Sequence, residues 1–326
     1  MSKENYFTLG WHLFFGKNQQ RTGMMTKQDK LKAPGVQWIT LDNGYRVWTQ
    51  RVGSGPVKLL TLHGGPGCSH EYLECLEEFL APQGVEVILY DQLGSWCSDQ
   101  PEDESLWQLE RFISEIEQVR EALGLEDFYL YGHSCGGLWA IEYALKYQRH
   151  LKGLVLAGIT GSIHSYMAHI NHLREQLPPD VIEKMKHYEA QDELDNEEYQ
   201  SLLKEHLYRK YICRLPHWPE SLSRAFDHMN HQVYNTMQGN NEFVFTGNLL
   251  GWDRWNELAE IRVATLVLSG RYDTMAPDDQ KQMASILPHS RLVLCDNGSH
   301  CSMWDDPENY KEALVSFFQD VESGRI

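Results

Sequence analysis

The stretch YGHSCGG (residues 131–137) closes an apolar run that begins at Phe128 and opens a helical pattern, LWAIEYALKYQ. It therefore places a serine in a turn between a strand and a helix. Residues 132–136 fit the pattern G-x-S-x-G, in which a nucleophilic serine occupies a sharp turn and the flanking glycines avoid collisions with the backbone. We predict that Ser134 is a nucleophile and that Cys135 contributes its backbone N–H, not its thiol. A glycine-rich turn without chemistry is the alternative.

A serine nucleophile requires a base, and the base requires a group that fixes its tautomer. Asp273 ends the segment SGRYD after the run ATLVL, and His300 ends DNGSH after RLVLC. Both residues fall at the carboxyl ends of expected strands, where sites form in open parallel sheets. We predict a triad of Ser134, His300 and Asp273. Capping of the helix that follows is an alternative role for Asp273.

A glycine loop, HGGPG (residues 63–67), follows the apolar run VKLLTL directly. Attack of a serine on a carbonyl creates an oxyanion, which backbone N–H groups can stabilise. We predict that the N–H groups of Gly65 and Cys135 form this oxyanion hole, because Pro66 has no N–H to donate. Gly64 is expected to lie beside the substrate in the same loop.

Short runs rich in Val, Leu and Ile alternate with helical segments, which predicts an α/β fold with a mostly parallel sheet buried on both faces. The runs are 57–62, 85–90, 128–132, 153–157, 264–270 and 291–295, and the helical segments are 105–123, 137–149, 277–287 and 306–322. A hairpin is expected at Asp42-Asn43-Gly44. Residues 161–250 show helical patterns and no convincing strand. We therefore predict an N-terminal extension (1–33), a core in two parts (34–160 and 251–326) and a helical cap (161–250).

Composition excludes several classes of protein. Acidic residues outnumber basic ones by 46 to 29, a formal charge of -17, which disfavours nucleic acid as a partner. No apolar stretch approaches the roughly 20 residues that span a bilayer, and we expect no membrane association and no signal peptide. Seven cysteines without a CxxC pair favour a reducing, cytoplasmic location. HEYLE (70–74) lacks the second histidine of a zinc helix, so we expect no metal and no organic cofactor.

The motifs HGGPG, GHSCGG, GRYD and GSH, in this order, resemble those of the proline iminopeptidase family of α/β-hydrolases. The likeness spans roughly residues 35–320 and includes YDQLGSWCSDQP (90–101). NEFVFTGNLLGWD (241–253) is similar to a segment of the tricorn-interacting aminopeptidase and amino-acid amidase branch. The resemblance implies an α/β-hydrolase fold with an inserted cap. It also implies removal of N-terminal residues, often proline, from short peptides, or hydrolysis of small amides.

In that family, acidic residues of the cap or pocket hold the free amine of the substrate, and Glu242 falls on one such position; an exposed cap glutamate is the alternative. Two departures leave other substrates open. Thr274 stands where tricorn-interacting members carry a second acid, and Cys135 stands where an aromatic residue is common. Esterase or lactonase activity is one alternative, and a ligand-binding receptor on a hydrolase fold is another. Trp139 is expected to line an apolar pocket, unless it fills the core. The oligomeric state is left open.

Overall fold

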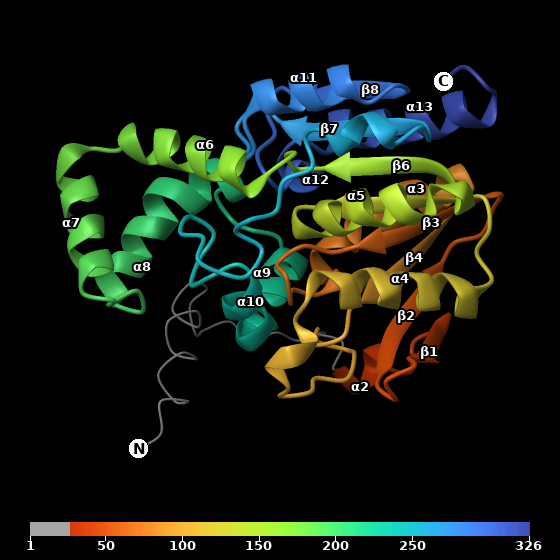
Figure 1. Ribbon diagram of the computed structural model, residues 1–326, viewed down its shortest axis with the longest axis horizontal. Coiled ribbons are helices and arrows are strands. Elements are labelled where there is room, and N and C mark those ends of the chain that lie inside the picture. Colours follow the sequence, from red (N-terminus) through yellow and green to blue (C-terminus); the bar gives the residue numbers. More distant parts are fainter. Residues whose placement is uncertain (1–26) are drawn as a thin grey trace.

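The computed structural model describes residues 27–326, so most of the expected extension, residues 1–33, lies outside it. Within this range eight strands form one sheet in the order β1-β2-β4-β3-β5-β6-β7-β8 (Figure 1). The pairs β1–β2 and β2–β4 are antiparallel, and the remaining pairs are parallel, as the sequence predicted. The strands are β1 (Val36–Thr40), β2 (Arg46–Val52), β3 (Val57–Leu62), β4 (Val85–Asp91), β5 (Phe128–His133), β6 (Leu151–Ala157), β7 (Thr265–Gly270) and β8 (Ser290–Cys295).

The expected hairpin joins β1 to β2. Gly44 has a φ of 87°, a conformation that glycine adopts without strain, and its N–H donates to the carbonyl of Leu41 at 2.8 Å. The backbone N–H of Leu41 in turn donates to the carbonyl of Tyr45 at 2.8 Å. These bonds set the register in which Trp38 lies opposite Trp48.

Helices cover both faces of the sheet. Successive side chains of a strand point to opposite faces. Phe128 of β5 packs edge-on against Tyr143 of α5, whereas the next residue, Tyr129, packs against Phe318 of α13. The helices α5 and α13 therefore lie on opposite faces, and all six residues of β5 are buried between them. The core helices are α2 (Lys27–Lys30), α3 (Cys75–Leu80), α4 (Leu109–Leu123), α5 (Cys135–Tyr147), α11 (Pro277–Ile286), α12 (Ser302–Asp305) and α13 (Pro307–Glu322).

Strand β3 lies at the point where the strand order reverses. It pairs in parallel with β4 on one side and with β5 on the other. In open α/β sheets the loops after such strands separate and leave room for a ligand. The loop after β3 is the HGGPG segment and the loop after β5 holds Ser134, so the topology brings the two motifs together.

The helix expected at 105–123 begins later than predicted. A 3-10 turn at Glu104–Leu106 comes first, and its cap is Asp103, whose carboxylate accepts the N–H of Ser105 at 3.0 Å. Trp107 follows in a non-helical conformation with its side chain fully buried, and α4 starts only at Leu109. Burial of the tryptophan ring outweighs the local helical preference, which sequence periodicity does not register.

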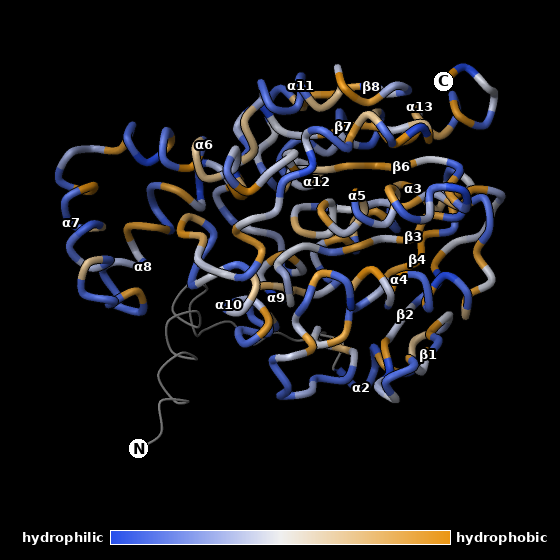
Figure 2. Tube along the Cα trace, in the orientation of Figure 1, coloured by the Kyte–Doolittle hydropathy of each residue, from blue (hydrophilic) through white to orange (hydrophobic). Residues whose placement is uncertain are grey.

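The segment between β6 and β7 is helical throughout most of its length. Figure 1 shows α6, α7 and α8 extending beyond the end of the sheet, whereas α9 and α10 lie closer to it. The helices are α6 (Ile163–Glu175), α7 (Pro179–Ala190), α8 (Glu197–Leu203), the π-helical segment η6 (Lys204–Ile212), α9 (Glu220–Asp227) and α10 (His231–Met237). The trace of α7 is largely hydrophilic and that of β6 largely hydrophobic (Figure 2). This contrast fits an outlying cap on a buried sheet.

Partly buried ion pairs attach the cap to the core. The guanidinium of Arg224 in α9 donates to the carboxylates of Glu71 and Glu74 at 2.6 and 2.8 Å. His228 also contacts Glu71 at 2.6 Å and stacks on Trp96 at a ring distance of 3.5 Å. The cap is therefore held over the loops that end β3 and β4.

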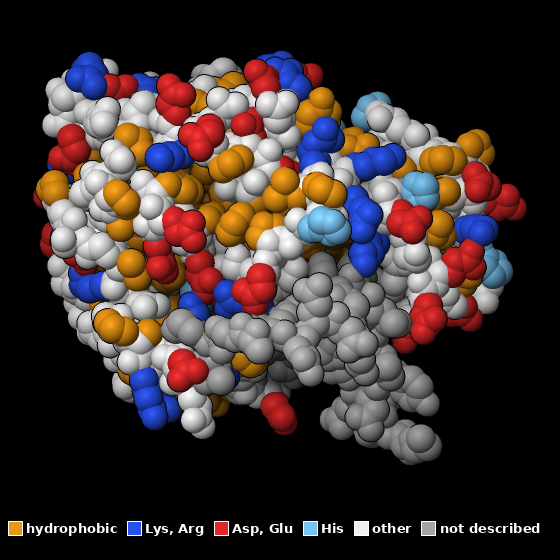
Figure 3. Space-filling view, turned by 180° about the vertical axis from the view of Figure 1, so that it is seen from behind, with side chains coloured by type: hydrophobic (Ala, Val, Ile, Leu, Met, Phe, Trp, Pro, Cys, Tyr) orange, Lys and Arg blue, Asp and Glu red, His pale blue; other side chains and the backbone are white. Residues whose placement is uncertain are grey.

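The surface agrees with the composition. On the face seen in Figure 3, hydrophobic side chains gather near the middle, and acidic and basic side chains are interspersed around them. No helix within residues 27–326 has both the length and the apolar character needed to cross a bilayer.

Candidate active site

Ser134 lies in a strained turn between β5 and α5. Its φ of 56° and ψ of −129° are uncommon for a residue with a side chain. The flanking glycines make the turn possible, because a Cβ on Gly132 would lie 2.2 Å from the carbonyl oxygen of Gly136. A Cβ on Gly136 would lie 2.2 Å from the carbonyl oxygen of Leu62. The turn therefore has the geometry that G-x-S-x-G predicts.

The glycine loop after β3 packs directly on this turn. A Cβ on Gly64 would lie 2.8 Å from the Cβ of Ser134, so only glycine allows this approach. Gly65 has a φ of 111°, again a conformation for glycine, and lines the same cavity as Ser134. The structure thus brings Gly64, Gly65, Ser134 and Cys135 together.

His300 and Asp273 come from neighbouring strand ends. β7 and β8 pair in parallel, so the loops that follow them lie side by side. His300 Nδ1 donates to Asp273 Oδ1 at 2.7 Å, and both side chains are buried. Asp273 also accepts hydrogen bonds from Ser269 Oγ at 2.8 Å and from the backbone of Met275 at 3.1 Å. These bonds fix the proton on Nδ1 and leave Nε2 free to accept one.

Burial and charge oppose each other in this pair. Burial by itself would raise the pKa of Asp273, but the adjacent His300 and the donors to its oxygens lower that pKa below its usual value. Burial likewise disfavours a charged imidazole, yet Asp273 raises the pKa of His300 above its usual value. The carboxylate therefore stays ionised and favours a proton on the imidazole, as general base catalysis requires.

The end of the π-helical segment η6 holds the loop that contains His300. The backbone N–H of His300 donates to the carbonyl of Tyr211 at 2.9 Å, and that of Cys301 donates to the carbonyl of Ile212 at 2.8 Å. The last carbonyls of a helix have no partner within the helix, so they are available for this role. The cap thus contributes directly to the position of His300.

Ser134 lies between two cavities. The first is lined by Ser134, His300 and Gly65, and the second is lined by Ser134, Gly65 and Cys135. Glu242 lines both. Within the described residues the hydroxyl of Ser134 makes no hydrogen bond, and catalytic hydrogen bonds commonly shorten only when substrate binds.

Comparison with known proteins agrees with this geometry. Residues 58–307 match the family model described as alpha/beta hydrolase fold. The chain is 41% identical over 286 residues to a proline iminopeptidase of Flavobacterium johnsoniae, a match that covers 86% of this chain and 96% of the relative. It is 43% identical over 284 residues to one from Elizabethkingia meningoseptica, with 86% and 95% covered. The crystal structure of a Mycobacterium smegmatis proline iminopeptidase superposes with a TM-score of 0.82 at 26% identity, covering 89% of this chain and 100% of that one.

The chain belongs to the proline iminopeptidase family of α/β-hydrolases. It is therefore a serine hydrolase, and the family and fold expected from the motifs are confirmed.

Glu242 is a partly buried carboxylate in this hydrolase, not a fully exposed one. Its oxygens accept hydrogen bonds from the hydroxyls of Tyr166 at 3.0 Å and Tyr234 at 3.1 Å. In the described part of the chain no lysine or arginine pairs with it. Burial raises the pKa of Glu242 above its usual value. A cation bound beside it would compensate for the cost of burying this charge.

The two departures from the family pattern have structural consequences. Thr274 is fully buried, and its hydroxyl donates to Asp273 Oδ1 at 3.2 Å and lies 3.4 Å from His300 Nδ1. It therefore supports the carboxylate at a position where a second acid would add charge. Burial raises the pKa of the Cys135 thiol well above its usual value, so the thiol stays protonated and is a poor nucleophile.

Trp139 packs in the core, which favours the core-filling alternative over the predicted substrate contact. Its ring is fully buried and stacks on Phe112 of α4 at 4.8 Å, and it lines neither cavity. Its indole N–H donates to Gln92 Oε1 at 3.1 Å. Trp139 follows Ser134 closely in the sequence, but it lies on the side of α5 that packs against α4.

Sequence reasoning missed the tyrosines of the site. Tyr166 and Tyr234 come from two cap helices, and no local pattern marks either of them. Tyr72 also lines the cavity, and its hydroxyl accepts the backbone N–H of Gly64 at 2.7 Å. In the sequence, its segment HEYLE was compared only with a zinc helix. The signal in the sequence that could have indicated Tyr72 is its place shortly after the HGGPG loop.

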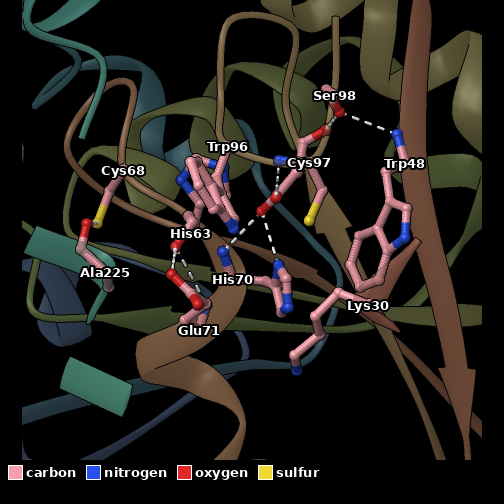
Figure 4. Close-up of polar contacts among 12 residues, drawn as sticks. Lys30, Trp48, His63, Cys68, His70, Glu71, Trp96, Cys97, Ser98 and Ala225 are labelled. Carbon is pink, nitrogen blue, oxygen red and sulfur yellow. Dashed lines mark hydrogen bonds and ion pairs between the residues drawn. The ribbon is translucent and has the colours of Figure 1, made fainter. Parts of the chain in front are cut away.

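A buried group outside the cavities has the residue types of a metal site. Ligand atoms of His70, Asp91 and Cys97 lie within 4.8 Å of one another. Asp91 accepts hydrogen bonds from the backbone and Nδ1 of His70 at 2.7 and 2.9 Å and from the backbone of Cys97 at 2.9 Å (Figure 4). Burial also raises the pKa of the Cys97 thiol, whereas metal ligation requires the thiolate. These bonds tie the loop after β4 to the 3-10 helix η2 (His70–Leu73), so we interpret the group as structural.

Proposed function

We propose that the protein removes N-terminal proline, or another small residue, from short peptides and hydrolyses related small amides. The observation that supports this most directly is the partly buried carboxylate of Glu242, which lines both cavities beside Ser134. A carboxylate that has no lysine or arginine partner among the described residues, in a mostly apolar site, is suited to a protonated primary or secondary amine of the substrate. The named activity of the curated relatives supports the same choice.

The proposed reaction proceeds through an acyl-enzyme. Ser134 Oγ attacks the carbonyl carbon of the scissile amide while His300 Nε2 accepts its proton. The backbone N–H groups of Gly65 and Cys135 stabilise the oxyanion. His300 then gives the proton to the leaving amine, and the C–N bond breaks. Water, deprotonated by His300, attacks the ester and releases the acid and Ser134. Asp273 keeps the imidazole in the required tautomer throughout.

This chemistry needs no metal or organic cofactor, and the proposed partner is a small molecule or short peptide. A reducing, cytoplasmic location fits the seven cysteines, which are all unpaired and buried.

A rate panel with the purified protein tests the activity. It compares arylamides of proline and alanine, amino-acid amides, short-chain esters and lactones. We expect the highest kcat/KM for the proline arylamide. Faster turnover of an ester or lactone, with no measurable amide hydrolysis, would establish the esterase or lactonase alternative. Stoichiometric acylation without steady-state turnover would indicate a receptor.

Replacing Glu242 by Gln tests the amine site. We expect kcat/KM for a proline arylamide to fall by about 10²-fold, since loss of one partner of a buried charge contact costs about 2–5 kcal/mol. Simple esters without an amine should be affected far less. Glu205→Gln, an exposed glutamate of the cap, is the matched control and should change neither rate. An equal loss on both substrate types would remove the proposed role.

The same variant has a stability signature. Because burial raises the pKa of Glu242, the charged form is disfavoured in the folded state. Stability is therefore lost as the pH rises from the unfolded pKa through the folded pKa. Glu242→Gln should raise the Tm at neutral pH and leave it unchanged in acid, where the carboxyl is protonated in both states. Calorimetry at the two pH values measures the difference.

A further inference from the structure

The peptide groups of Gly64 are held from both sides by side chains outside the triad. Its N–H donates to the hydroxyl of Tyr72 at 2.7 Å. Its carbonyl accepts a hydrogen bond from His63 Nδ1 at 2.9 Å. The direction of this bond is set because His63 Nε2 already accepts the backbone N–H of Gln92 at 3.3 Å, so the ring proton resides on Nδ1.

The bond from Gly64 to Tyr72 continues as a chain with only one possible direction. The Tyr72 oxygen accepts from Gly64, so its own proton is free to go to His133 Nδ1, 2.9 Å away. His133 Nε2 lies 2.9 Å from the backbone carbonyl of His300, which can only accept. His133 is therefore protonated on Nε2 and accepts on Nδ1. This series of hydrogen bonds connects the glycine loop to the backbone of His300, the proposed base.

This series of hydrogen bonds requires that His133 is neutral, and the surroundings of its side chain keep it neutral. The side chain is buried, and burial lowers the pKa of His133 to about 3. The ring of His300 lies 4.8 Å away and opposes a second positive charge when it accepts the proton of Ser134. The hydrogen bonds in this series therefore keep their direction while His300 changes its charge.

The Gly64–Gly65 peptide also determines where the proposed oxyanion donor points. In a trans peptide the C=O and the following N–H point in opposite directions. The carbonyl of Gly64 is held towards the ring of His63, so the N–H of Gly65 is directed to the opposite side. Gly65 lines both cavities at Ser134. The hydrogen bonds that hold the peptide groups on both sides of Gly64 therefore also fix the direction of the Gly65 N–H.

We propose that Tyr72 and His133 are positioning residues, whose hydrogen bonds fix the glycine loop (residues 63–67) relative to the backbone of His300. The inference rests on the proposed acyl-transfer function but concerns residues outside the triad and the amine site. Oxyanion donors act because they are aimed before charge develops. Loss of the Tyr72 hydroxyl would leave the N–H of Gly64 and the Nδ1 of His133 without partners, and the loop could shift.

Tyr72→Phe tests the proposal, with Tyr131→Phe as its matched control. Tyr131 is also buried, and among residues 27–326 its hydroxyl bonds only to that of Tyr310, at 2.5 Å. Both variants lose one buried hydroxyl and should lose thermal stability, Tyr72→Phe the more, because it leaves two groups without a partner and Tyr131→Phe leaves one. Only Tyr72→Phe should lower kcat for a proline arylamide, by about 10-fold or more. One oxyanion donor accounts for a rate factor of about 10²–10³, and a donor that points in the wrong direction loses part of that factor. KM should change less than about twofold, since ground-state binding does not use the donor.

Binding of a boronic acid analogue of proline gives a second readout. The boronate forms a tetrahedral adduct on the serine, so its affinity should fall in Tyr72→Phe by about the same factor as kcat, whereas competitive inhibition by free proline should not change. A purely structural role would weaken both inhibitors alike.

A double-mutant cycle links the two residues. His133→Phe removes both nitrogens, and its effect should not add to that of Tyr72→Phe, because either change breaks the same chain. His133→Gln retains one acceptor and one donor and should recover part of the activity. Additive losses, or equal kcat in Tyr72→Phe and Tyr131→Phe, would overturn the proposal. Ser134→Ala separates this failure from failure of the proposed function, because a retained rate there would refute the reaction itself.

Discussion

Replacing Ser134 by Ala should lower the hydrolysis of a proline arylamide by at least about 10⁴-fold, because the acyl-enzyme cannot form without the hydroxyl. The fold should remain intact. Alanine tolerates the positive φ at this position no worse than serine, and the backbone N–H of residue 134 keeps its 2.9 Å bond to the carbonyl of Ala157. The serine hydroxyl makes no hydrogen bond within residues 27–326, so its removal leaves no partner unsatisfied.

Steady-state kinetics and labelling by a fluorophosphonate measure this loss, and the Tm reports on the fold. Ser285→Ala changes an exposed serine of α11 and serves as the control that should retain both rate and label. Labelling of the Ser134→Ala protein at the normal rate would show that another residue is the nucleophile.

Replacing Asp273 by Asn should reduce kcat/KM by about 10³–10⁴-fold, because an amide N–H facing His300 Nδ1 favours the wrong tautomer. The remaining activity should show a shifted pH profile. Asp273 raises the pKa of His300, so removing its charge lowers that pKa. The acid limb of kcat/KM, which reports protonation of the base in the free enzyme, should move to lower pH.

Glu242 and Asp305 also raise the pKa of His300 and remain in the variant, so the shift reports Asp273 alone. Asp99→Asn is the control, since the carboxylate of Asp99 binds the backbone of Arg46 at 2.7 Å, away from both cavities. An unchanged pH profile in Asp273→Asn, with only a modest loss of rate, would assign this aspartate to helix capping.

Local patterns in the sequence were sufficient for the sheet, for most of its strands and for the order of the motifs. Buried strands appear as short Val, Leu and Ile runs because both faces of a parallel sheet are covered. The glycines of HGGPG and GHSCGG were informative for a related reason, since a Cβ at residue 64, 132 or 136 would collide with neighbouring atoms. The Asp273–His300 contact was predicted correctly from chain order and strand ends, although its catalytic role stays a prediction.

Other features depend on contacts between distant segments, and local patterns do not reveal them. Burial of Trp107 delays the start of α4. Trp139 follows the nucleophile closely in sequence, yet it packs on Phe112 because of the direction it takes from α5. The partners of Glu242 are tyrosines from two helices that are separated by most of the cap.

The sequence by itself determined the fold class and the family, and it supplied the residues that we propose for acyl transfer. These follow from short segments whose chemistry and backbone demands are local. Only the tertiary structure decided which carboxylate lines the cavities beside Ser134, that Trp139 belongs to the core, and that Tyr72 and His133 join the glycine loop to the backbone of His300. The physical reason is that burial and the direction of a hydrogen bond are set by neighbours from distant parts of the chain, and these neighbours meet only when the sheet and cap are assembled.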